Sequence, residues 1–322
     1  MSKAIIGEKN FAARPVDVYL SDVNETQDLV FFDRYEQRLK TESIYGGKPL
    51  RWAYGTTLGR LCLEAVIKRR WFSSLYGRWA DCGCSRSEVT AFIERFELDP
   101  DEFADPPGTF KTFNEFFHRR LKPAARPLPT SKNAVIFPAD GRHFLVPDLS
   151  KEQAIYAKGQ RFDLLELLGD KELAARFENG TAILSRLCPT DYHRFHFPLD
   201  GKGSTPRLIN GALYSVNPIA LAGSLARIWQ NKRRVTVVTD SPVGDYLFLE
   251  IGATNVGTIV DTVAPESEIE RGDEKGYFRF GGSMVITIFP EGAFVPADDL
   301  AKQAADGIEL YARFGDTMGS TQ

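Results

Sequence analysis

The sequence predicts an α+β fold, in which a helical N-terminal region packs on a mostly antiparallel β-sheet domain. Two observations indicate this class. Before residue 122, apolar residues recur at helical spacing, with polar capping patterns ahead of them. After residue 131, short apolar runs such as RVTVVTD and YLFLEIG are broken by Gly, Pro and Asp. The runs do not alternate with helices as in a parallel sheet, which favours antiparallel pairing.

The first elements are predicted from residue periodicity. Residues 16–33 contain two β-prone runs around a polar turn and predict a β-hairpin. Residues 58–79 carry apolar side chains at helical spacing and predict an amphipathic helix. This window holds five basic residues and one acidic residue, although the whole chain has a net charge of −3.

Two later helices are predicted from capping boxes, in which Ser or Thr is followed three residues later by Glu. Ser85 with Glu88 predicts one helix start, and Thr112 with Glu115 predicts another. The proline-rich residues 122–131 show no period and predict a linker or domain boundary.

This boundary divides the chain into residues 1–125, with the hairpin and the amphipathic helices, and a β-rich domain at residues 126–322. Within the second part, residues 162–170 (FDLLELLGD) predict one helix that interrupts the strands.

Composition excludes several classes of protein. A net charge of −3 provides no global basic field and argues against a nucleic-acid partner. Cys82 and Cys84 form CxC without a nearby His, a poor zinc pattern, so we expect reduced thiols in a cytosolic compartment and no metal. No signal peptide is evident at the N-terminus, and 18 apolar residues never occur in a row.

Three polar clusters in the β-rich part supply the residue types of a base-activated nucleophile. Asp140 lies in PADG, His193 and His196 lie in DYHRFHFPLDG, and Ser283 follows two glycines in FGGSMVITIF. Each has a simpler interpretation: a turn for Asp-Gly, two structural histidines for HxxH, and an ordinary loop for Gly-Gly-Ser. Flanking prolines make a helical, metal-binding HxxH improbable.

Several motifs taken together resemble the phosphatidylserine decarboxylase family, and the resemblance runs from about Leu58 to the C-terminus. One departure is Met284, where the family commonly has Thr; the attacking hydroxyl at Ser283 is unchanged. The motifs, in chain order, are FNEFFHRRLKPAARPL, FPADG, AKGQRFDLLELLG, LCPTDYHRFHFPLDG, LYSVNP, IGATNVGTI and RGDEKGYFRFGGSMVITIF.

The resemblance implies that the chain cuts itself by autocatalytic serinolysis. The Ser283 hydroxyl attacks the Gly282 carbonyl, with His196 as the base and Asp140 fixing the tautomer of that histidine. Glycine before the serine lets the backbone bend for this attack. Elimination and hydrolysis then leave a pyruvoyl group, which divides the protein into a large chain (1–282) and a small chain (283–322).

The same resemblance implies the reaction and its partners. The covalent pyruvoyl group forms a Schiff base with phosphatidylserine and accepts electrons as CO2 leaves, giving phosphatidylethanolamine. His193 then protonates the substrate carbon. Neither pyridoxal phosphate nor a metal is required. The expected partners are the lipid, a membrane surface, the two chains themselves and a homodimer, without nucleic acid.

The amphipathic helix predicts peripheral association with the cytoplasmic side of the cell membrane. A helix with Lys and Arg on one side and aromatic residues on the other lies in a membrane interface. The alternative is that its apolar residues pack on the β-rich domain, and both interpretations can hold on different faces. The membrane-binding candidates are Lys68, Arg69, Arg70, Trp71 and Phe72.

A second Gly-Ser pair, Gly319-Ser320, is an alternative cleavage site. Cleavage there leaves only a three-residue tail, whereas Ser283 begins a β-prone run that can hold a cofactor in the sheet. Ser320 is therefore expected to lie in a frayed terminus.

Three other functions fit the sequence less well. A family member acting on a soluble amino acid is disfavoured by the basic, aromatic helix. A Ser-His-Asp hydrolase usually carries GxSxG before a helix, whereas Ser283 lies in GGSMV before a strand. An inactive membrane-binding relative does not account for the complete set of polar residues.

Overall fold

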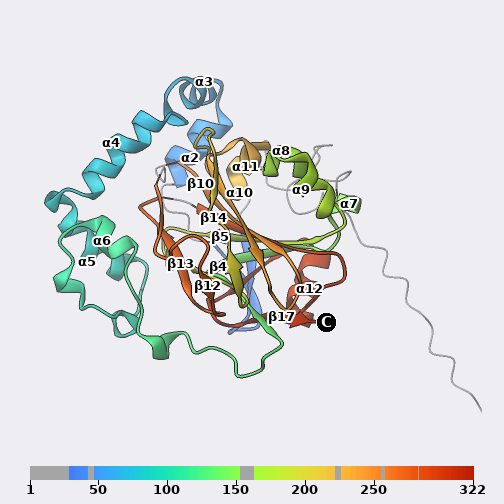
Figure 1. The fold of residues 1–322 in the computed structure, drawn as a ribbon. Helices are drawn as coiled ribbons and strands as arrows, with labels where there is room; N and C mark the ends of the chain where they lie inside the picture. Colours follow the sequence, from blue (N-terminus) through green and yellow to red (C-terminus); the bar gives the residue numbers. More distant parts are fainter. Residues whose placement is uncertain (1–28, 43–46, 153–162, 222–225, 255–257, 282) are drawn as a thin grey trace, which may run out of the picture.

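The α+β prediction is confirmed by the computed structural model, in which helices surround a large, mostly antiparallel sheet (Figure 1). The structure describes residues 29–42, 47–152, 163–221, 226–254, 258–281 and 283–322. Most of the hairpin expected at residues 16–33 therefore lies outside the described residues. The described hairpin joins β1 to β2 at the edge of the sheet.

The largest sheet places β14 between β10 and β5, near its middle. The strand order is β12-β7-β9-β10-β14-β5-β4-β16-β1-β2, with β8 beside β9, and β1–β16 is the parallel pair. Its strands are β1 (Val30–Asp33), β2 (Arg38–Thr41), β4 (Gly141–Val146), β5 (Thr181–Leu187), β7 (Gly201–Gly203), β8 (Arg207–Ile209), β9 (Arg233–Thr239), β10 (Tyr246–Gly252), β12 (Glu268–Ile269), β14 (Ser283–Phe289) and β16 (Glu309–Ala312).

Two small sheets complete the β structure. One has the order β11-β13-β6 and the other β15-β17-β3. Their strands are β3 (Ala134–Ile136), β6 (Arg194–His196), β11 (Ile259–Asp261), β13 (Glu274–Phe278), β15 (Phe294–Pro296) and β17 (Thr317–Thr321).

Both faces of the central strand β14 are buried, because alternate side chains enter two separate hydrophobic cores. Met284 and Ile286 enter the core that helices cover. Val285 and Phe289 enter the other core, with Phe195 and Phe278 of the small sheet β11-β13-β6. Ser283 shares the strand face of Val285, so its side chain lies on the same side as the small sheet.

Short helices interrupt the strands in several places, so the expectation of a single helix in the second half was wrong. The predicted helix forms α8, and its neighbours cover the core that contains Met284 (Figure 1). These helices are α7 (Leu149–Glu152), α8 (Leu164–Leu168), α9 (Lys171–Arg176), α10 (Pro218–Leu221) and α11 (Ala226–Gln230). The last helix, α12 (Asp298–Ala305), packs on the other core, in which Leu300 lies with Val285.

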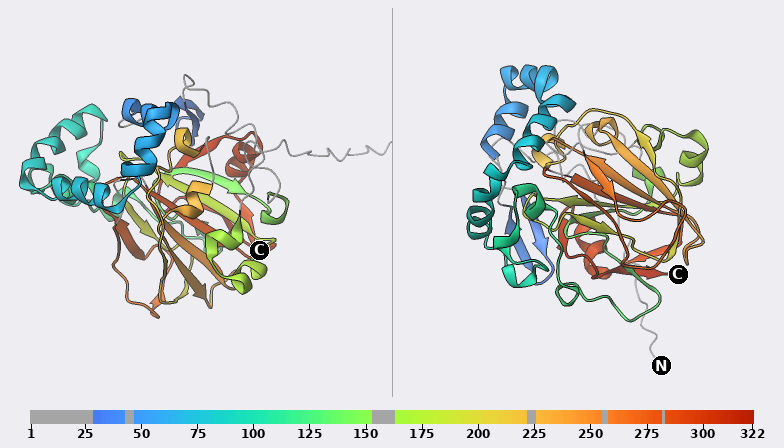
Figure 2. Two further views of the ribbon diagram at one scale, coloured as in Figure 1. Left: turned by 90° about the horizontal axis from the view of Figure 1, so that it is seen from above. Right: turned by 60° about the vertical axis from the view of Figure 1, so that its left-hand side comes forward.

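The N-terminal helices form an arm, residues 47–117, that curves along one side of the β structure (Figure 2). The helix expected at residues 58–79 is divided: a π-helical turn and a break separate α3 from α4. The arm comprises α2 (Gly47–Gly55), α3 (Thr57–Cys62), α4 (Arg70–Ala80), α5 (Ser87–Arg95) and α6 (Phe113–Phe117).

One of the two predicted capping boxes is present. The Thr112 hydroxyl accepts the Glu115 amide at 3.1 Å and caps α6. Ser85 does not cap α5; its hydroxyl donates to carbonyls of the preceding turn and accepts the Phe113 amide at 2.9 Å. A tertiary contact therefore replaces the local one at Ser85.

The last forty residues are integrated into the sheets at three places. After β14, β16 pairs with β4 and β1, and β17 pairs with β3. Ser320 lies in β17 opposite Val295, so the expectation of a frayed terminus was wrong. Gly319 is required by close packing, because a Cβ there would lie 2.3 Å from the Val295 carbonyl oxygen.

Candidate active site

The segment before β14 has the backbone and burial expected of a special site. Gly281 has φ of +134°, a conformation that residues with a Cβ rarely adopt. Ser283 is fully buried, and its hydroxyl has no hydrogen-bond partner among the described residues. An unpaired buried hydroxyl costs free energy, so this one needs a functional explanation. Met284 points to the opposite face and packs in the other core.

His193 lies next to this segment on the strand face occupied by the small sheet. Its Nδ1 donates to the Asp191 carbonyl at 3.0 Å, while Nε2 has no partner among the described residues. Its ring packs on Phe117 at 3.8 Å between centroids. Burial lowers the pKa of His193 to about 3, which the carbonyls of Asp191 and Gly281 partly oppose. The imidazole is therefore neutral at pH 7, with a free Nε2 lone pair.

Asp191 fixes the position of this histidine. Arg142 donates to both Asp191 carboxylate oxygens, at 2.8 and 2.6 Å, and the Cys188 amide donates at 2.7 Å. All these groups are buried. The loop before β6 is consequently held by charge-assisted bonds, which are among the stronger hydrogen bonds in proteins.

His196 is held by partners that the sequence did not predict. Its Nδ1 donates to the Gly272 carbonyl at 2.9 Å, and Nε2 accepts the Tyr192 hydroxyl at 3.2 Å. The ring stacks on Phe314 with centroids 3.6 Å apart. Burial lowers the pKa of His196 to about 4, and the charge of Asp140 partly opposes this.

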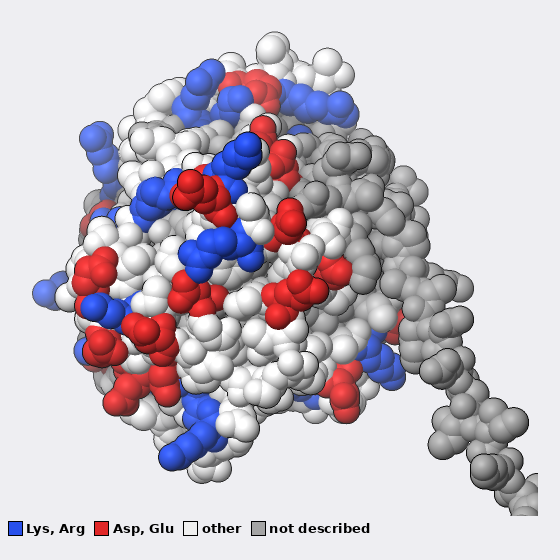
Figure 3. Space-filling model, turned by 45° about the vertical axis from the view of Figure 1, so that its right-hand side comes forward, with Lys and Arg blue, Asp and Glu red and all other residues white. Residues whose placement is uncertain are grey.

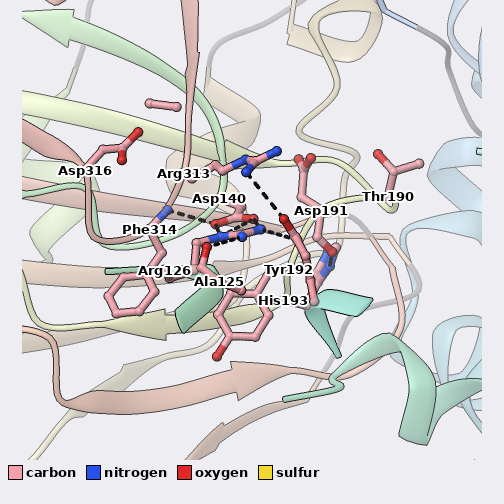
Figure 4. Close-up of polar contacts among 12 residues, drawn as sticks. Ala125, Arg126, Asp140, Thr190, Asp191, Tyr192, His193, Arg313, Phe314 and Asp316 are labelled. Atoms are coloured by element: carbon pink, nitrogen blue, oxygen red, sulfur yellow. Dashed lines mark hydrogen bonds and ion pairs between the residues drawn. The ribbon is translucent and has the colours of Figure 1, made fainter. Parts of the chain in front are cut away.

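Asp140 forms a buried ion pair with Arg126 (Figure 4). Arg126 donates to both carboxylate oxygens at 2.6–3.2 Å, and the Phe314 amide donates to Oδ1 at 2.8 Å. The structure gives no hydrogen bond between Asp140 and His196 among the described residues. Instead, Asp140 reaches the histidine through Phe314, whose amide it binds and whose ring stacks on the imidazole.

The structure brings the predicted site residues together in two pairs, and no hydrogen bond or ring contact among the described residues joins one pair to the other. Asp140 and His196 share Phe314, and His193 borders the Gly281 carbonyl. Sequence reasoning missed Arg126, because it lies in the proline-rich stretch interpreted as a linker. It also missed Tyr192, although that residue adjoins the predicted histidines.

Two cavities adjoin the segments that carry these residues. One of about 370 Å³ is lined by Phe280, Arg279 and residues of α4. The other, of about 530 Å³, reaches Asp140, Asp191 and Tyr192. Within the described ranges, no cluster of His, Cys, Asp or Glu could hold a metal ion.

His143, on β4 beside Asp140, provides a pH prediction. Burial lowers its pKa to about 3, below an unfolded value of about 6.5. The folded state then binds fewer protons, so stability is present above pH 6.5 and is lost as pH falls. Between pH 7 and 5 we expect the unfolding free energy of wild type to fall by about 2 kcal/mol more than that of His143→Gln. Denaturant titrations at both pH values measure this; equal losses in the two proteins would contradict it.

The membrane-binding candidates differ in exposure. Lys68 is held by ion pairing to Glu64 and by a 2.8 Å bond to the Tyr214 hydroxyl. Trp71 is 54% exposed, Arg69 is exposed, and Phe72 is half-buried. The Arg70 side chain lies outside what the structure describes. No helix in the described part of the chain is long and apolar enough to span a bilayer.

Comparisons with known proteins agree with these observations. A family model described as phosphatidylserine decarboxylase matches residues 113–320. The phosphatidylserine decarboxylase proenzyme of Clostridium perfringens (strain SM101 / Type A) is 39% identical over 288 residues, covering 89% of this chain and 98% of the relative. The proenzyme of Ruminiclostridium cellulolyticum is 39% identical over 289 residues, covering 90% and 96%. That of Desulfitobacterium hafniense (strain DSM 10664 / DCB-2) is 38% identical over 289 residues, covering 90% and 97%.

Proposed function

Because the chain belongs to the phosphatidylserine decarboxylase family, we propose that it converts phosphatidylserine to phosphatidylethanolamine and CO2. Its catalytic group is a pyruvoyl formed from Ser283 when the chain cleaves itself between Gly282 and Ser283. The observation that carries the proposal is the buried Ser283 hydroxyl, which has no partner among the described residues and lies directly after two glycines, at the start of a central strand.

The fold supports a two-chain product. A small chain of residues 283–322 would keep β14 between two strands of the large chain and β16 between two others. Its new N-terminus would lie opposite Gly252 and Leu187 in the sheet. A group formed at position 283 would therefore be held by strand pairing on both sides, which is the rigid support that a reactive group needs.

Self-cleavage starts when the Ser283 hydroxyl adds to the Gly282 carbonyl and loses its proton to a neutral imidazole. The peptide bond becomes an ester. Elimination of this ester frees the large-chain carboxylate and leaves a dehydroalanine at position 283. Water then hydrolyses the dehydroalanine to the pyruvoyl group, and its nitrogen leaves as ammonia. Both site histidines are neutral at pH 7, so either can accept a proton. We assign the base to His196, with Asp140 as its positioning residue through Phe314.

The pyruvoyl ketone supplies an electrophile for the substrate amine and a sink for electrons when CO2 leaves. The described residues fit it: the unsatisfied Ser283 position is enclosed, and His193 offers an unpartnered Nε2 nearby. We assign to His193 the proton transfer at the substrate carbon: its unprotonated Nε2 would take a proton from the substrate ammonium group and return it to that carbon at each turnover. Its Nδ1 bond to the Asp191 carbonyl leaves Nε2 as the nitrogen that exchanges the proton.

His196→Ala and Asp140→Ala are both expected to block or greatly slow self-cleavage. The first removes the proton acceptor, and the second releases Phe314, which packs on it. Asp140→Ala also removes one of the two carboxylates that pair with the buried Arg126 and leaves only Glu102, so the protein should lose stability as well. Asp140→Asn, which keeps an acceptor for the Phe314 amide, is therefore compared, with thermal unfolding as a control. Rapid, complete cleavage of the folded His196 and Asp140 variants would exclude these roles.

We also propose that the helical arm contacts the cytoplasmic side of a membrane. Leu58 and Leu61 on α3, and Trp71 and Leu75 on α4, are 54–66% exposed, which is unusual for large apolar residues. Charges are interspersed on the face drawn in Figure 3, whereas residues 58–79 carry five basic residues and one acidic residue. An exposed apolar and basic segment suits an anionic lipid surface.

Replacing Lys68, Arg69 and Arg70 with Glu is expected to weaken binding to anionic vesicles while self-cleavage continues. Each basic residue near such a surface contributes on the order of 1 kcal/mol. Lys68 should contribute least, because it is already paired with Glu64. A matched control replaces the exposed Lys132, Lys171 and Lys302 with Glu. Equal vesicle binding by both triple variants would show that this segment packs on the β-rich domain and does not bind the membrane.

Activity is tested by CO2 release from purified protein. We expect release from a serine-headgroup lipid in micelles and none from a free amino acid such as tryptophan. The reverse preference would make this chain a family member with a soluble substrate. Esterase activity by an uncut chain would indicate a hydrolase instead.

A further inference from the structure

The cavity of about 370 Å³ connects the helical arm to the segment that precedes the cleavage site. One wall is the α4 face with Ser74, Gly77 and Arg78, and another is Arg279 with Phe280. Phe280 is three residues before Ser283 and is bound to the arm. Its backbone amide donates a hydrogen bond to the Asn114 side chain at 3.0 Å. The cavity therefore lies between the arm and the segment that leads to the reactive residue.

Positive charge predominates in this cavity. Its lining includes three cationic residues, Arg78, Lys232 and Arg279, and one anionic residue, Asp81. Asp81 is already occupied, because Arg279 pairs with it and Asn114 donates to it at 2.7 Å. Arg78 makes no hydrogen bond or ion pair with any described residue. A cation without a counter-ion at the wall of a cavity is suited to an anionic ligand.

The α4 helix continues from this charge to the exposed apolar residues. Trp71, Leu75 and Arg78 are spaced by four and three residues, so they follow one stripe of the helix. Small residues, Ser74 and Gly77, face the cavity beside Arg78 and leave room for a ligand. A molecule with an anionic group at Arg78 could thus place an apolar chain along Leu75 and Trp71.

We propose that this cavity is the subsite for the headgroup phosphate of the lipid, bound by Arg78 and Lys232. The proposal rests on the proposed function. In a serine-headgroup lipid, three atoms separate the amine nitrogen from phosphorus: two carbons and the ester oxygen. When the amine is directed to position 283, this short link keeps the phosphate close to that position. We assign the phosphate to the cavity beside Phe280. Arginine binds phosphate oxygens with two parallel hydrogen bonds, which favours it for this recognition.

The test separates headgroup recognition from membrane binding by using a monomeric, short-chain phosphatidylserine below its critical micelle concentration. Arg78→Gln and Lys232→Gln are each expected to raise KM about tenfold, as for loss of one charge-assisted hydrogen bond, with a smaller change in kcat. The matched control is Arg95→Gln, another exposed arginine of the arm that does not line the cavity. The two-chain pattern on a denaturing gel should be unchanged in all variants.

A second readout does not depend on turnover. Glycerol 3-phosphate, which has no amine, should bind wild type in a phosphorus NMR titration, inhibit competitively, and bind Arg78→Gln about tenfold more weakly. Unchanged KM and unchanged phosphate affinity in both cavity variants would overturn the subsite. An equal rise in KM for Arg95→Gln would also overturn it, since a general charge effect would then suffice. Wild type that neither splits nor releases CO2 would instead overturn the proposed function.

Discussion

The Ser283→Ala protein is expected to remain a single chain of 322 residues and to release no CO2 from phosphatidylserine. Alanine has no hydroxyl to attack the Gly282 carbonyl, and no ketone can form at position 283. The substitution should fold, because the Ser283 hydroxyl makes no hydrogen bond with a described residue. The pairing of residue 283 with Gly252 and Leu187 is through the backbone, which alanine keeps. Replacing an unpaired buried hydroxyl with a methyl hydrogen also removes a desolvation cost.

Ser320→Ala is the matched control for this experiment, because Ser320 belongs to the other Gly-Ser pair. It should split normally, since Gly319 is there for packing against Val295. If Ser283→Ala splits at residue 282, or if Ser320→Ala stays whole, the cleavage site is misassigned.

The His193→Ala protein is expected to split into two chains and yet release CO2 at least about 100-fold more slowly, the smaller end of what a general acid contributes. Cleavage occurs once, whereas protonation of the substrate carbon occurs at every turnover. The ketone should still be detectable by reaction with an amine and cyanoborohydride. This readout separates a catalytic loss from a failure to form the cofactor.

The geometry gives this experiment a second outcome. His193 borders the Gly281 carbonyl, and its Nε2 has no partner among the described residues, whereas Nε2 of His196 accepts the Tyr192 hydroxyl. An uncut His193→Ala protein would show that His193 takes the proton during cleavage. Cut and fully active protein would remove it from both steps.

Local signals predicted much of the fold. The Thr112 cap and β14 depend on residues close together in the chain, and both are present in the structure. Ser85 shows the same local pattern, but its hydroxyl binds Phe113, which the chain brings from 28 residues away. The short helices of the second half span one or two turns, too few for a recognisable period.

The sequence indicated which residues are candidates for the site, but not which groups they contact. Motif order indicated Asp140, His193, His196 and Ser283, whereas the contacts that orient them come from the tertiary structure. The tautomer of His196 is set by the Gly272 carbonyl, a backbone group that carries no side-chain signal. Arg126 could not be predicted, because it lies in a proline-rich segment. Such segments resemble exposed linkers in sequence even when one of their side chains is buried.

The most direct test of the account is the intact mass of the two chains in purified wild-type protein. We predict a large chain ending at Gly282 and a small chain of residues 283–322 that is lighter by one ammonia than the same peptide with N-terminal serine. That difference identifies a pyruvoyl in place of an amine. A single intact chain, or a small chain that begins with an unmodified Ser283, would contradict the central claim that this protein makes its own catalytic group.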